Sequence, residues 1–362
     1  MNIQKLKTRN LYETLKTQIM TQELPESSKL PSESELISKY GVSRYGARKA
    51  IDKLVSENLV VKHQGKGCFV LPLQNPIKPF NNSKQILLIA SRAEHFYFLK
   101  SINGIERALQ ESGYTLTIKL SNYNSDIEAS LFKAALKENY AGFLIFPSGS
   151  AYIYTNLYLY RYIESHKIPC IILGNRIPCV NLPSVVTDDY MGGHLAADYF
   201  IAKGHTSFAC IINKEEYSGC MRYAGFIEGI NMASPTPDPP LIFWFGHEEK
   251  DHMFIEREKE LLLLASRVTA IFCFNDETAV NLYQLLVKNG FRVPEDISII
   301  GYDDSYLCET NPLPLTSLHQ DPEISGYTAA KNLLHLIAEP SYNCNKTFIP
   351  YLVERNSVAE IK

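Results

Sequence analysis

The sequence lacks the marks of membrane proteins and of exported proteins. No apolar run approaches the roughly 18 residues that a membrane-spanning helix needs, so we expect no membrane partner. The opening residues, MNIQKLKTRN, are polar, and no apolar stretch follows them. We therefore expect no signal peptide and place the protein in the cytoplasm.

The sequence also lacks cysteine and histidine patterns that bind metals. Its eight cysteines form no CxxC pair, and most stand among apolar residues, as Cys170 does in IPCIIL and Cys273 in IFCFN. Small buried thiols in a reducing compartment are the expected state of such cysteines. His247 and His252 lie five residues apart, a spacing that does not align them on one helix face. We expect no metal site and no disulfide.

Motifs of nucleotide-dependent enzymes are missing as well. No GxGxxG follows the first strand of the larger part of the chain, and no P-loop occurs anywhere. This argues against a sugar kinase carrying an extra domain, and no lysine-centred motif marks a pyridoxal-dependent enzyme. We expect no cofactor, no catalytic residues and no enzymatic activity, and a turnover assay on pentoses with ATP would test this.

Charge is unevenly divided along the 362 residues. Residues 1–70 hold 12 Lys and Arg against 7 Asp and Glu, whereas the remainder holds 24 against 32. A small basic head on a larger acidic body predicts that only the head meets a polyanion. The length predicts more than one domain, and the hydrophobic fraction of 45% suffices for large cores.

Three helices are predicted in the basic head. The first carries an apolar stripe at helical spacing, formed by Tyr12, Leu15 and Ile19. Ser32 is the expected N-cap of the second helix, and Glu35 completes a capping box. Gly41 ends that helix, and Ser43 caps the third. Two helices joined by a short glycine-containing turn form the helix-turn-helix pattern, which binds DNA.

The third helix would enter the major groove with its N-terminus nearest the base edges. Arg44 and Arg48 share one face of it and can bond guanine or clamp phosphate. Tyr45 can contact a thymine methyl or a phosphate. Gly46 is unfavourable in a helix, and we expect it to permit close approach of the backbone to DNA. A small helical domain with solvated basic residues is the alternative interpretation.

Beyond the third helix, two β-rich runs joined by HQGKG predict a hairpin, or wing. Its glycines free the backbone, and its basic residues reach phosphate or the minor groove. The predicted DNA contacts of the head are Ser43, Arg44, Tyr45, Arg48, Lys49, His63, Gly65 and Lys66.

The stretch KLPSESELISKYGVSRYGARKAIDKLVSENLVVKHQGKGCFV resembles the winged-helix DNA-binding domain of GntR-type bacterial repressors. The resemblance covers about residues 8–71 and implies a homodimer on a palindromic operator, with Arg44, Arg48 and Gly65 as DNA contacts. The chain departs from the family pattern at two positions. Some members carry Arg in place of Ser34, and many carry Thr in place of Gly46.

We divide the chain into a DNA-binding domain, residues 1–71, a proline-rich linker, residues 72–84, and a body, residues 85–362. Strand-like and helix-like segments alternate through the body, and its strands are continuously apolar. Such strands belong to parallel sheets covered on both faces, so the predicted fold class is α/β. About 280 residues exceed one ordinary doubly wound sheet, and two lobes are expected.

Polar residues follow several of these strands. Asn275 and Asp276 end one strand, Asp303 and Asp304 end the next along the chain, and PSGS at 147–150 follows another. Ligands of such sheets bind at the carboxyl ends of strands, and carboxylates accept hydroxyl hydrogens well. Each Asp is equally consistent with a helix cap, and the two roles do not exclude each other.

Four stretches resemble the effector domain of LacI/GalR-type repressors, which has the fold of periplasmic sugar-binding proteins: VVTDDYMGGHLAADYFIAKGH, CFNDETAVNLYQLLVKNGFRVPEDISIIGYDDS, PLTSLHQDPEISGYTAAKNLL and YLVERNS. The resemblance covers about residues 84–358. It implies two lobes joined by crossovers near 181–187, 315–319 and 346–351. The effector ligands that it implies are Ser91, Tyr97 in the loop EHFYF, Ser148, Arg222, Asn275, Asp303 and Gln320, with Asn175 or Arg176 as a further candidate.

A GntR-type head on a LacI-type body is the arrangement of the arabinose repressors of Gram-positive bacteria, which this chain resembles. That resemblance implies a sugar-responsive repressor on operator DNA at the nucleoid, with a pentose, L-arabinose first, as effector. A different sugar, a sugar phosphate or an activator role stays open from the residues. An enzyme with a DNA-binding head and an exported sugar-binding protein are the competing function classes.

Overall fold

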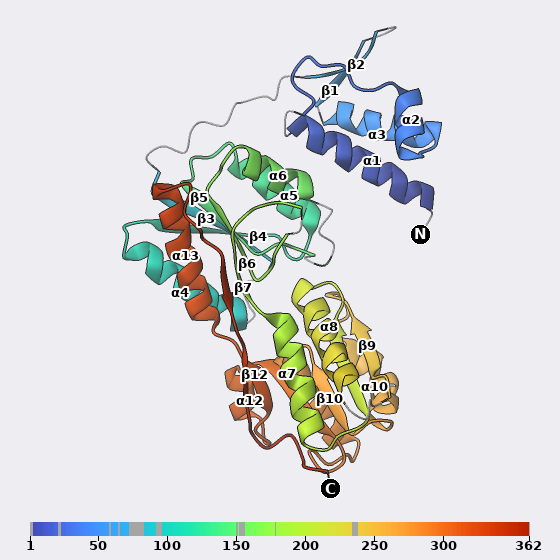
Figure 1. Cartoon of the computed structure of the whole chain (residues 1–362), viewed down its shortest axis with the longest axis vertical. Coiled ribbons are helices and arrows are strands. Elements are labelled where there is room, and N and C mark those ends of the chain that lie inside the picture. Colours follow the sequence, from blue (N-terminus) through green and yellow to red (C-terminus); the bar gives the residue numbers. More distant parts are fainter. Residues whose placement is uncertain are drawn as a thin grey trace.

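The computed structural model describes residues 3–20, 23–57, 59–63, 66–71, 83–91, 96–149, 151, 156–177, 179–233 and 238–361. The predicted linker, 72–84, lies almost wholly outside the described residues. Figure 1 shows a small head and two stacked lobes. Among the described residues, no helix is long and apolar enough to span a membrane.

The head is a winged helix-turn-helix. Its elements are α1 (Ile3–Met20), α2 (Glu33–Tyr40), α3 (Arg44–Ser56), β1 (Val60–His63) and β2 (Gly67–Val70). The two strands pair antiparallel and form the wing. The predicted apolar stripe of α1 faces the domain core, where Tyr12, Leu15 and Ile19 are buried against α3.

The first lobe, here the N-lobe, is built on a six-stranded parallel sheet in the order β13-β7-β6-β5-β3-β4. Its strands are β3 (Gln85–Ala90), β4 (Thr115–Leu120), β5 (Gly142–Ile145), β6 (Cys170–Leu173), β7 (Ser184–Thr187) and β13 (Lys346–Phe348). Helices α5 (Ser125–Ala135) and α6 (Leu157–Ser165) cover one face. Helices α4 (Phe96–Gln110) and α13 (Pro322–Ala338) cover the other.

The second lobe, here the C-lobe, repeats this plan with the strand order β14-β12-β11-β10-β8-β9. Its strands are β8 (Phe208–Asn213), β9 (Leu241–Phe245), β10 (Ala270–Cys273), β11 (Ser298–Asp303), β12 (Thr316–His319) and β14 (Tyr351–Val353). Helices α7 (Asp189–Ala202) and α8 (Tyr217–Met232) cover one face. On the other lie α9 (Met253–Glu256), α10 (Glu258–Ala265) and α11 (Asp276–Lys288), and α12 (Tyr306–Thr310) follows β11.

The predicted fold class is confirmed. The central strands β8 and β11 are buried along their whole length, as continuous apolar strands of doubly covered sheets must be. Two local predictions were incomplete. Strand β14 pairs antiparallel with β12, and Phe96–Phe98, expected in a loop, form the first turn of α4.

The chain changes sheet three times. It leaves the N-lobe sheet after Thr187, returns after His319, and crosses again between Phe348 and Tyr351. The carboxyl ends of both sheets face each other across these crossovers, which places the residues that follow the strands in one cleft.

Candidate functional site

The recognition helix α3 begins as its sequence predicts. Ser32 and Glu35 form the capping box of α2, and Gly41 ends that helix with a left-handed φ of 60°. Ser43 then caps α3, and its Oγ accepts from the Gly46 N–H at 3.0 Å. The first turn of α3 therefore carries exposed side chains, and Tyr45 is 75% exposed.

Arg48 lies exposed on the same face as Arg44, together with Lys49. Its Nε donates to Glu33 Oε1 of α2 at 3.0 Å. A phosphate or base that binds Arg48 has to compete with Glu33. We therefore expect Arg44 to bind DNA more readily than Arg48.

Gly46 has a different role from the predicted one. It is buried, and a Cβ at this position would lie 2.4 Å from Oγ1 of Thr8 in α1. Glycine thus leaves room for Thr8 where α1 packs closely on α3. Close approach of the backbone to DNA does not explain it, because the missing side chain faces the protein.

The wing places two of its three predicted contacts at its tip. His63 ends β1 opposite Gly67, and the Lys66 N–H donates to the His63 carbonyl at 3.0 Å. Both side chains are exposed. The third predicted contact, Gly65, lies outside the described residues.

A pocket lies between the two lobes. Residues of both lobes line it, and six of the seven predicted effector residues are among them: Ser91, Tyr97, Arg222, Asn275, Asp303 and Gln320. The seventh, Ser148, is buried behind the pocket wall, where its Oγ bonds Ser121 Oγ at 2.5 Å. Of the further candidates, Asn175 lines the pocket, whereas Arg176 donates to Thr347 Oγ1 at 2.5 Å.

Arg222 is the central cation of the pocket. Its Nε donates to Asp189 Oδ1 at 2.8 Å, its Nη1 donates to the Phe274 carbonyl at 2.5 Å, and its Nη2 lies 4.0 Å from Asp303 Oδ1. Its guanidinium also lies 3.4 Å from the centre of the Tyr302 ring. Burial alone lowers the pKa of Arg222, but the neighbouring carboxylates outweigh it, and the group stays charged.

Asp189 was not predicted as a site residue. It follows β7 in the stretch TDDY, directly after the N-cap Asp188 of α7, and the paired acids were the one available signal. Burial raises the pKa of Asp189, and the Arg222 charge opposes that rise. The pair therefore depends on both partners, since removal of either leaves a buried charge alone.

Asn275 and Asp276 differ from the expectation in one respect, the helix cap. Asn275 caps α11, because its Oδ1 accepts from the Thr278 N–H at 3.0 Å, and it also lines the pocket. Asp276 does not cap α11. It accepts from Ser317 Oγ and from the Ser305 N–H, both at 2.6 Å, and burial raises its pKa to about 6.

Asp303 and Gln320 form a second polar contact in the pocket. Gln320 Nε2 donates to Asp303 Oδ1 at 2.6 Å, and Gln320 Oε1 accepts from Thr187 Oγ1 at 2.9 Å. These residues stand at the ends of strands in different lobes. Gln320 therefore ties the C-lobe sheet to the first crossover.

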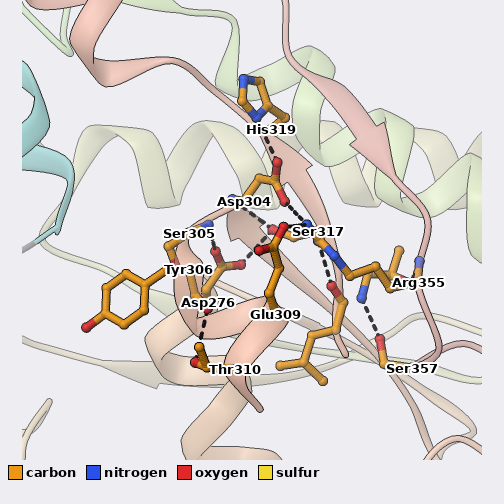
Figure 2. A network of polar contacts seen from close by, with 12 residues as sticks. Asp276, Asp304, Ser305, Tyr306, Glu309, Thr310, Ser317, His319, Arg355 and Ser357 are labelled. Atoms are coloured by element: carbon orange, nitrogen blue, oxygen red, sulfur yellow. Dashed lines mark hydrogen bonds and ion pairs between the residues drawn. The ribbon is translucent and has the colours of Figure 1, made fainter. Parts of the chain in front are cut away.

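Asp304 faces a separate cluster, shown in Figure 2. Its Oδ1 accepts from Arg355 Nη2 at 2.7 Å, and its Oδ2 lies 2.8 Å from His319 Nδ1. The His319 ring stacks on Tyr351 with centroids 4.6 Å apart. The helix-cap reading of Asp304 fails, because Ser305 precedes α12 and Asp304 joins β11, β12 and β14 instead.

The rim of the pocket carries charged and aromatic residues that the sequence prediction did not single out. The rings of Tyr123 in the N-lobe and His247 in the C-lobe stack with centroids 3.7 Å apart. His247 Nε2 lies 3.4 Å from Glu216 Oε1, and Lys250 Nζ lies 2.6 Å from Glu277 Oε2. His247 and Lys250 follow β9, a strand-end position that was the available signal.

No group of three or more His, Cys, Asp or Glu side chains within the described ranges is arranged to hold a metal ion. The eight cysteines, all within those ranges, are free thiols. Burial raises the pKa of Cys170, Cys210 and Cys273, so these thiols are protonated at neutral pH.

Comparison with known proteins finds two family models. Residues 7–70 match the bacterial regulatory proteins of the gntR family, and residues 197–358 match the periplasmic binding protein-like domain. The arabinose metabolism transcriptional repressor of Halalkalibacterium halodurans is 30% identical over 96% of this chain and 95% of its own length. That of Geobacillus stearothermophilus is 29% identical over 95% of each chain.

Among solved structures, a LacI family transcriptional regulator from Enterococcus faecalis with bound ribose superposes with a TM-score of 0.65. It is 26% identical and covers 77% of this chain and all of its own. The likeness of the two relatives extends over both the head and the body, whereas that of the ribose-bound structure is confined to part of the chain.

Proposed function

Because the chain belongs to the family of bacterial transcriptional repressors that join a GntR-type DNA-binding domain to a LacI-type effector domain, we propose that L-arabinose is the sugar that releases it from its operator. Binding of DNA by the head and of a sugar by the body is the coarse function of this family. The proposal adds three points to this function: the identity of the sugar, the homodimer and the palindromic operator.

The observation that carries the proposal is the arrangement of Arg222, Asp189 and Asp303 in the pocket. The planar guanidinium lies within 4.0 Å of each of the two carboxylates. Sugar hydroxyls both donate and accept, so they match such an alternation of fixed donors and acceptors. Tyr97 and Phe274 also line the pocket and add apolar surface, as in other small-molecule sites.

The charge balance of the pocket favours a free sugar over a sugar phosphate. Arg222 is paired with Asp189, and Lys250 is paired with Glu277. Glu216 stands beside His247, and Asp303 adds a further negative charge. A phosphate would have to displace carboxylates from their cations and to approach those that remain, which is electrostatically unfavourable.

L-Arabinose is the first choice because of the two relatives that match along their whole length. Both are repressors of arabinose metabolism by name. The regulator solved with ribose supports the same size class of sugar, a pentose, but it matches a smaller part of the chain.

A homodimer on a palindromic operator is supported by exposed apolar surface on the C-lobe. Ile255 of α9, Leu263 of α10 and Val287 of α11 are each about half or more exposed. These helices lie on the same face of the C-lobe sheet, and we propose that a second copy covers their exposed apolar side chains. The two heads of the dimer then bind the two half-sites of the operator, and this takes place in the cytoplasm, where the DNA lies.

The proposed mechanism is an opposition between two ligands. A sugar between the lobes bonds groups of both, such as Ser91 in the N-lobe and Arg222 in the C-lobe, and so favours one relative position of the lobes. Operator DNA favours the position in which two heads match the half-site spacing. The ligands then weaken each other by a coupling free energy of about 1–3 kcal/mol, equal in both directions.

The test uses DNA selected by the protein itself from a random library, so that no operator has to be assumed. Fluorescence anisotropy then measures affinity for this DNA with L-arabinose, D-xylose, D-ribose or arabinose 5-phosphate present. We expect L-arabinose to weaken DNA binding by about 5- to 150-fold and the phosphate to have no effect.

Arg222→Ala is the matched variant in the body. It should bind the selected DNA as the parent protein does and should not release it with L-arabinose. Release by another sugar alone would refute L-arabinose as the effector. Normal release from Arg222→Ala would refute the assignment of the pocket.

A further inference from the structure

Helix α1 of the head lies against helix α6 of the N-lobe, a contact that can be followed in Figure 1. Lys16 of α1 stands at this contact and is only 3% exposed. Its ammonium lies 4.6 Å from the centre of the Tyr158 ring of α6. Tyr158 is buried as well. A lysine on the outer face of a small basic domain is ordinarily solvated, so its burial against a ring of the other domain calls for an explanation.

The Lys16 ammonium is compensated from both domains. Within the head, it donates to Tyr12 Oη at 2.5 Å and to a carboxylate oxygen of Glu57, which directly follows α3. In the N-lobe, the Tyr158 ring offers its negative face, a cation–π contact that strengthens when water is excluded. The contact thus joins the end of the recognition helix to α6 through the buried Lys16 ammonium, and Lys133 of α5 lies 5.7 Å from the centre of the same Tyr158 ring.

A second set of contacts connects the effector pocket to helix α6. Phe146 and Pro147 line the pocket, and Ser148 follows them directly. The Ser148 N–H donates to Oε2 of Glu128, a residue of α5, at 2.5 Å. The pocket wall is therefore bound to a carboxylate that no other step of the proposed function uses.

Glu128 passes this connection on to α6. Its Oε1 accepts from Nδ2 of Asn156, the residue before α6, at 2.8 Å and from Tyr160 Oη at 2.9 Å. The carboxyl is 1% exposed, and burial raises its pKa. A buried acid with donors on two sides fixes the distance between them, since leaving any of these groups unsatisfied is costly.

We propose that helix α6 carries the effector signal to the DNA-binding domain, with Glu128 as the link to the pocket wall and the Tyr158–Lys16 contact as the link to the head. This inference rests on the proposed function, because it requires that a sugar in the pocket alters DNA binding. A sugar that shifts the wall at Phe146 and Pro147 shifts Ser148 and, through Glu128, the start of α6. The head follows because Lys16 is held by α6.

The experiment measures the ratio of operator affinities without and with saturating L-arabinose, on the full chain and with the selected DNA. Tyr158→Ala removes the ring from the contact. Glu128→Gln replaces one of the two acceptor oxygens with an NH2 group, so the donors on one side, either Ser148 or Asn156 and Tyr160, lose their acceptor. Each should lower the ratio by about tenfold or bring it to one, since typical couplings lie between about 5- and 150-fold. L-Arabinose affinity in the absence of DNA should stay within about threefold.

Tyr158→Phe is the conservative control. It keeps the ring face that Lys16 contacts and should keep the parent ratio. Because Tyr158 also packs in the N-lobe core, Lys16→Met provides a variant from the head side that retains an unbranched chain but loses the charge. It should behave as Tyr158→Ala does. Hydrogen exchange should show faster exchange of the α1 and α6 amides in both.

The outcomes separate this inference from the function on which it rests. If no sugar changes the operator affinity of the parent protein, the proposed function fails and the inference fails with it. If the parent responds and Tyr158→Ala, Lys16→Met and Glu128→Gln respond equally, the inference alone is overturned. A uniform loss of L-arabinose affinity without loss of the ratio would overturn it too, because it would show a merely structural role.

Discussion

Asp303 and Asp304 are consecutive residues whose carboxylates serve different clusters. Asp303 accepts from Gln320 in the effector pocket, and Asp304 binds Arg355 and His319 outside it. Both residues have left-handed backbones, with φ of 108° and 51°. Such conformations are unfavourable for residues with a Cβ and persist only where the surroundings impose them. The Asp304 contacts therefore help to hold Asp303 in its place.

Arg355→Ala should destabilise the C-lobe by about 3 kcal/mol. The reason is that Asp304 Oδ1, which is largely buried, loses the guanidinium that it binds. It should also weaken L-arabinose binding, since Asp303 loses its support. Urea unfolding and calorimetric titration measure the two effects. Arg355→Lys should recover little, because one ammonium does not reach both Asp304 and the Leu315 carbonyl.

Arg292→Ala is the control for this prediction. Arg292 and Asp296 form the same chemical pair in the same lobe, but the Arg292 side chain is 71% exposed. Its removal should cost less than about 1 kcal/mol and leave sugar affinity unchanged. Equal effects of the two substitutions would contradict the role given to Arg355.

Asp276 should make the stability of the C-lobe depend on pH. Burial raises its pKa from 3.8 to about 6, so between these values the folded protein binds more protons at this group than the unfolded chain does. The contribution of the group to stability therefore falls as pH rises through this window, by about 3 kcal/mol in all.

Asp276→Asn removes this titration and keeps an acceptor for the Ser305 N–H, while its NH2 group donates to Ser317 Oγ, which donates to Asp276 in the parent. Urea titrations at pH 4 and pH 7 measure the free energies of unfolding of the two proteins. The difference, parent minus variant, should be smaller or more negative at pH 7 than at pH 4. The parent should lose stability relative to the variant at the higher pH. A difference that stays constant across this range would refute the buried, ionising state of Asp276.

Local signals predicted the elements, and family motifs located many of the residues that line the pocket. The capping box of Ser32 and Glu35 and the left-handed Gly41 depend on neighbours within a few positions, so the sequence displays them directly. Arg222, Asn275 and Gln320 were located through their resemblance to family motifs, and all three line the pocket.

The pairings between distant residues were not predictable in this way. Asp189 and Arg222 come from neighbouring helices 33 positions apart, and nothing in TDDY tells which acid turns inward. Glu128 lies between Ile127 and Ala129 on α5, and nothing in these neighbours predicts that Asn156 and Tyr160 bond its carboxylate. Such contacts arise from packing of the lobe, which a local pattern does not encode.

Gly46→Ala should destabilise the head, contrary to the usual preference of helices for alanine. Alanine gains about 1 kcal/mol of helix propensity, but its Cβ would lie 2.4 Å from Thr8 Oγ1, and such overpacking costs about 1–3 kcal/mol. Hydrogen exchange of the α3 amides in the full chain reports the local stability.

The Thr8→Ala background provides the control for Gly46. Without Oγ1, the atoms nearest to the added Cβ are Ser43 Oγ at 3.3 Å and Cβ of residue 8 at 3.6 Å, so the severe overlap is gone. There Gly46→Ala should slow exchange of the α3 amides. If Gly46→Ala does not speed exchange of the α3 amides in the parent chain, Thr8 does not pack against Gly46 as described.

Arg44→Ala should weaken binding of the selected DNA by about 1–3 kcal/mol, or roughly 5- to 150-fold, and leave the affinity for L-arabinose unchanged. Arg267→Ala, an exposed arginine of the C-lobe, should change neither. Glu33→Ala should strengthen DNA binding, because it removes the carboxylate that competes for Arg48.

The salt dependence of these affinities tells what Arg44 contacts. A loss confined to the selected DNA indicates a base, whereas an equal loss on random DNA with a slope reduced by about one indicates a phosphate. Unchanged binding to both would remove α3 from the DNA interface, and the basic head would need another recognition surface.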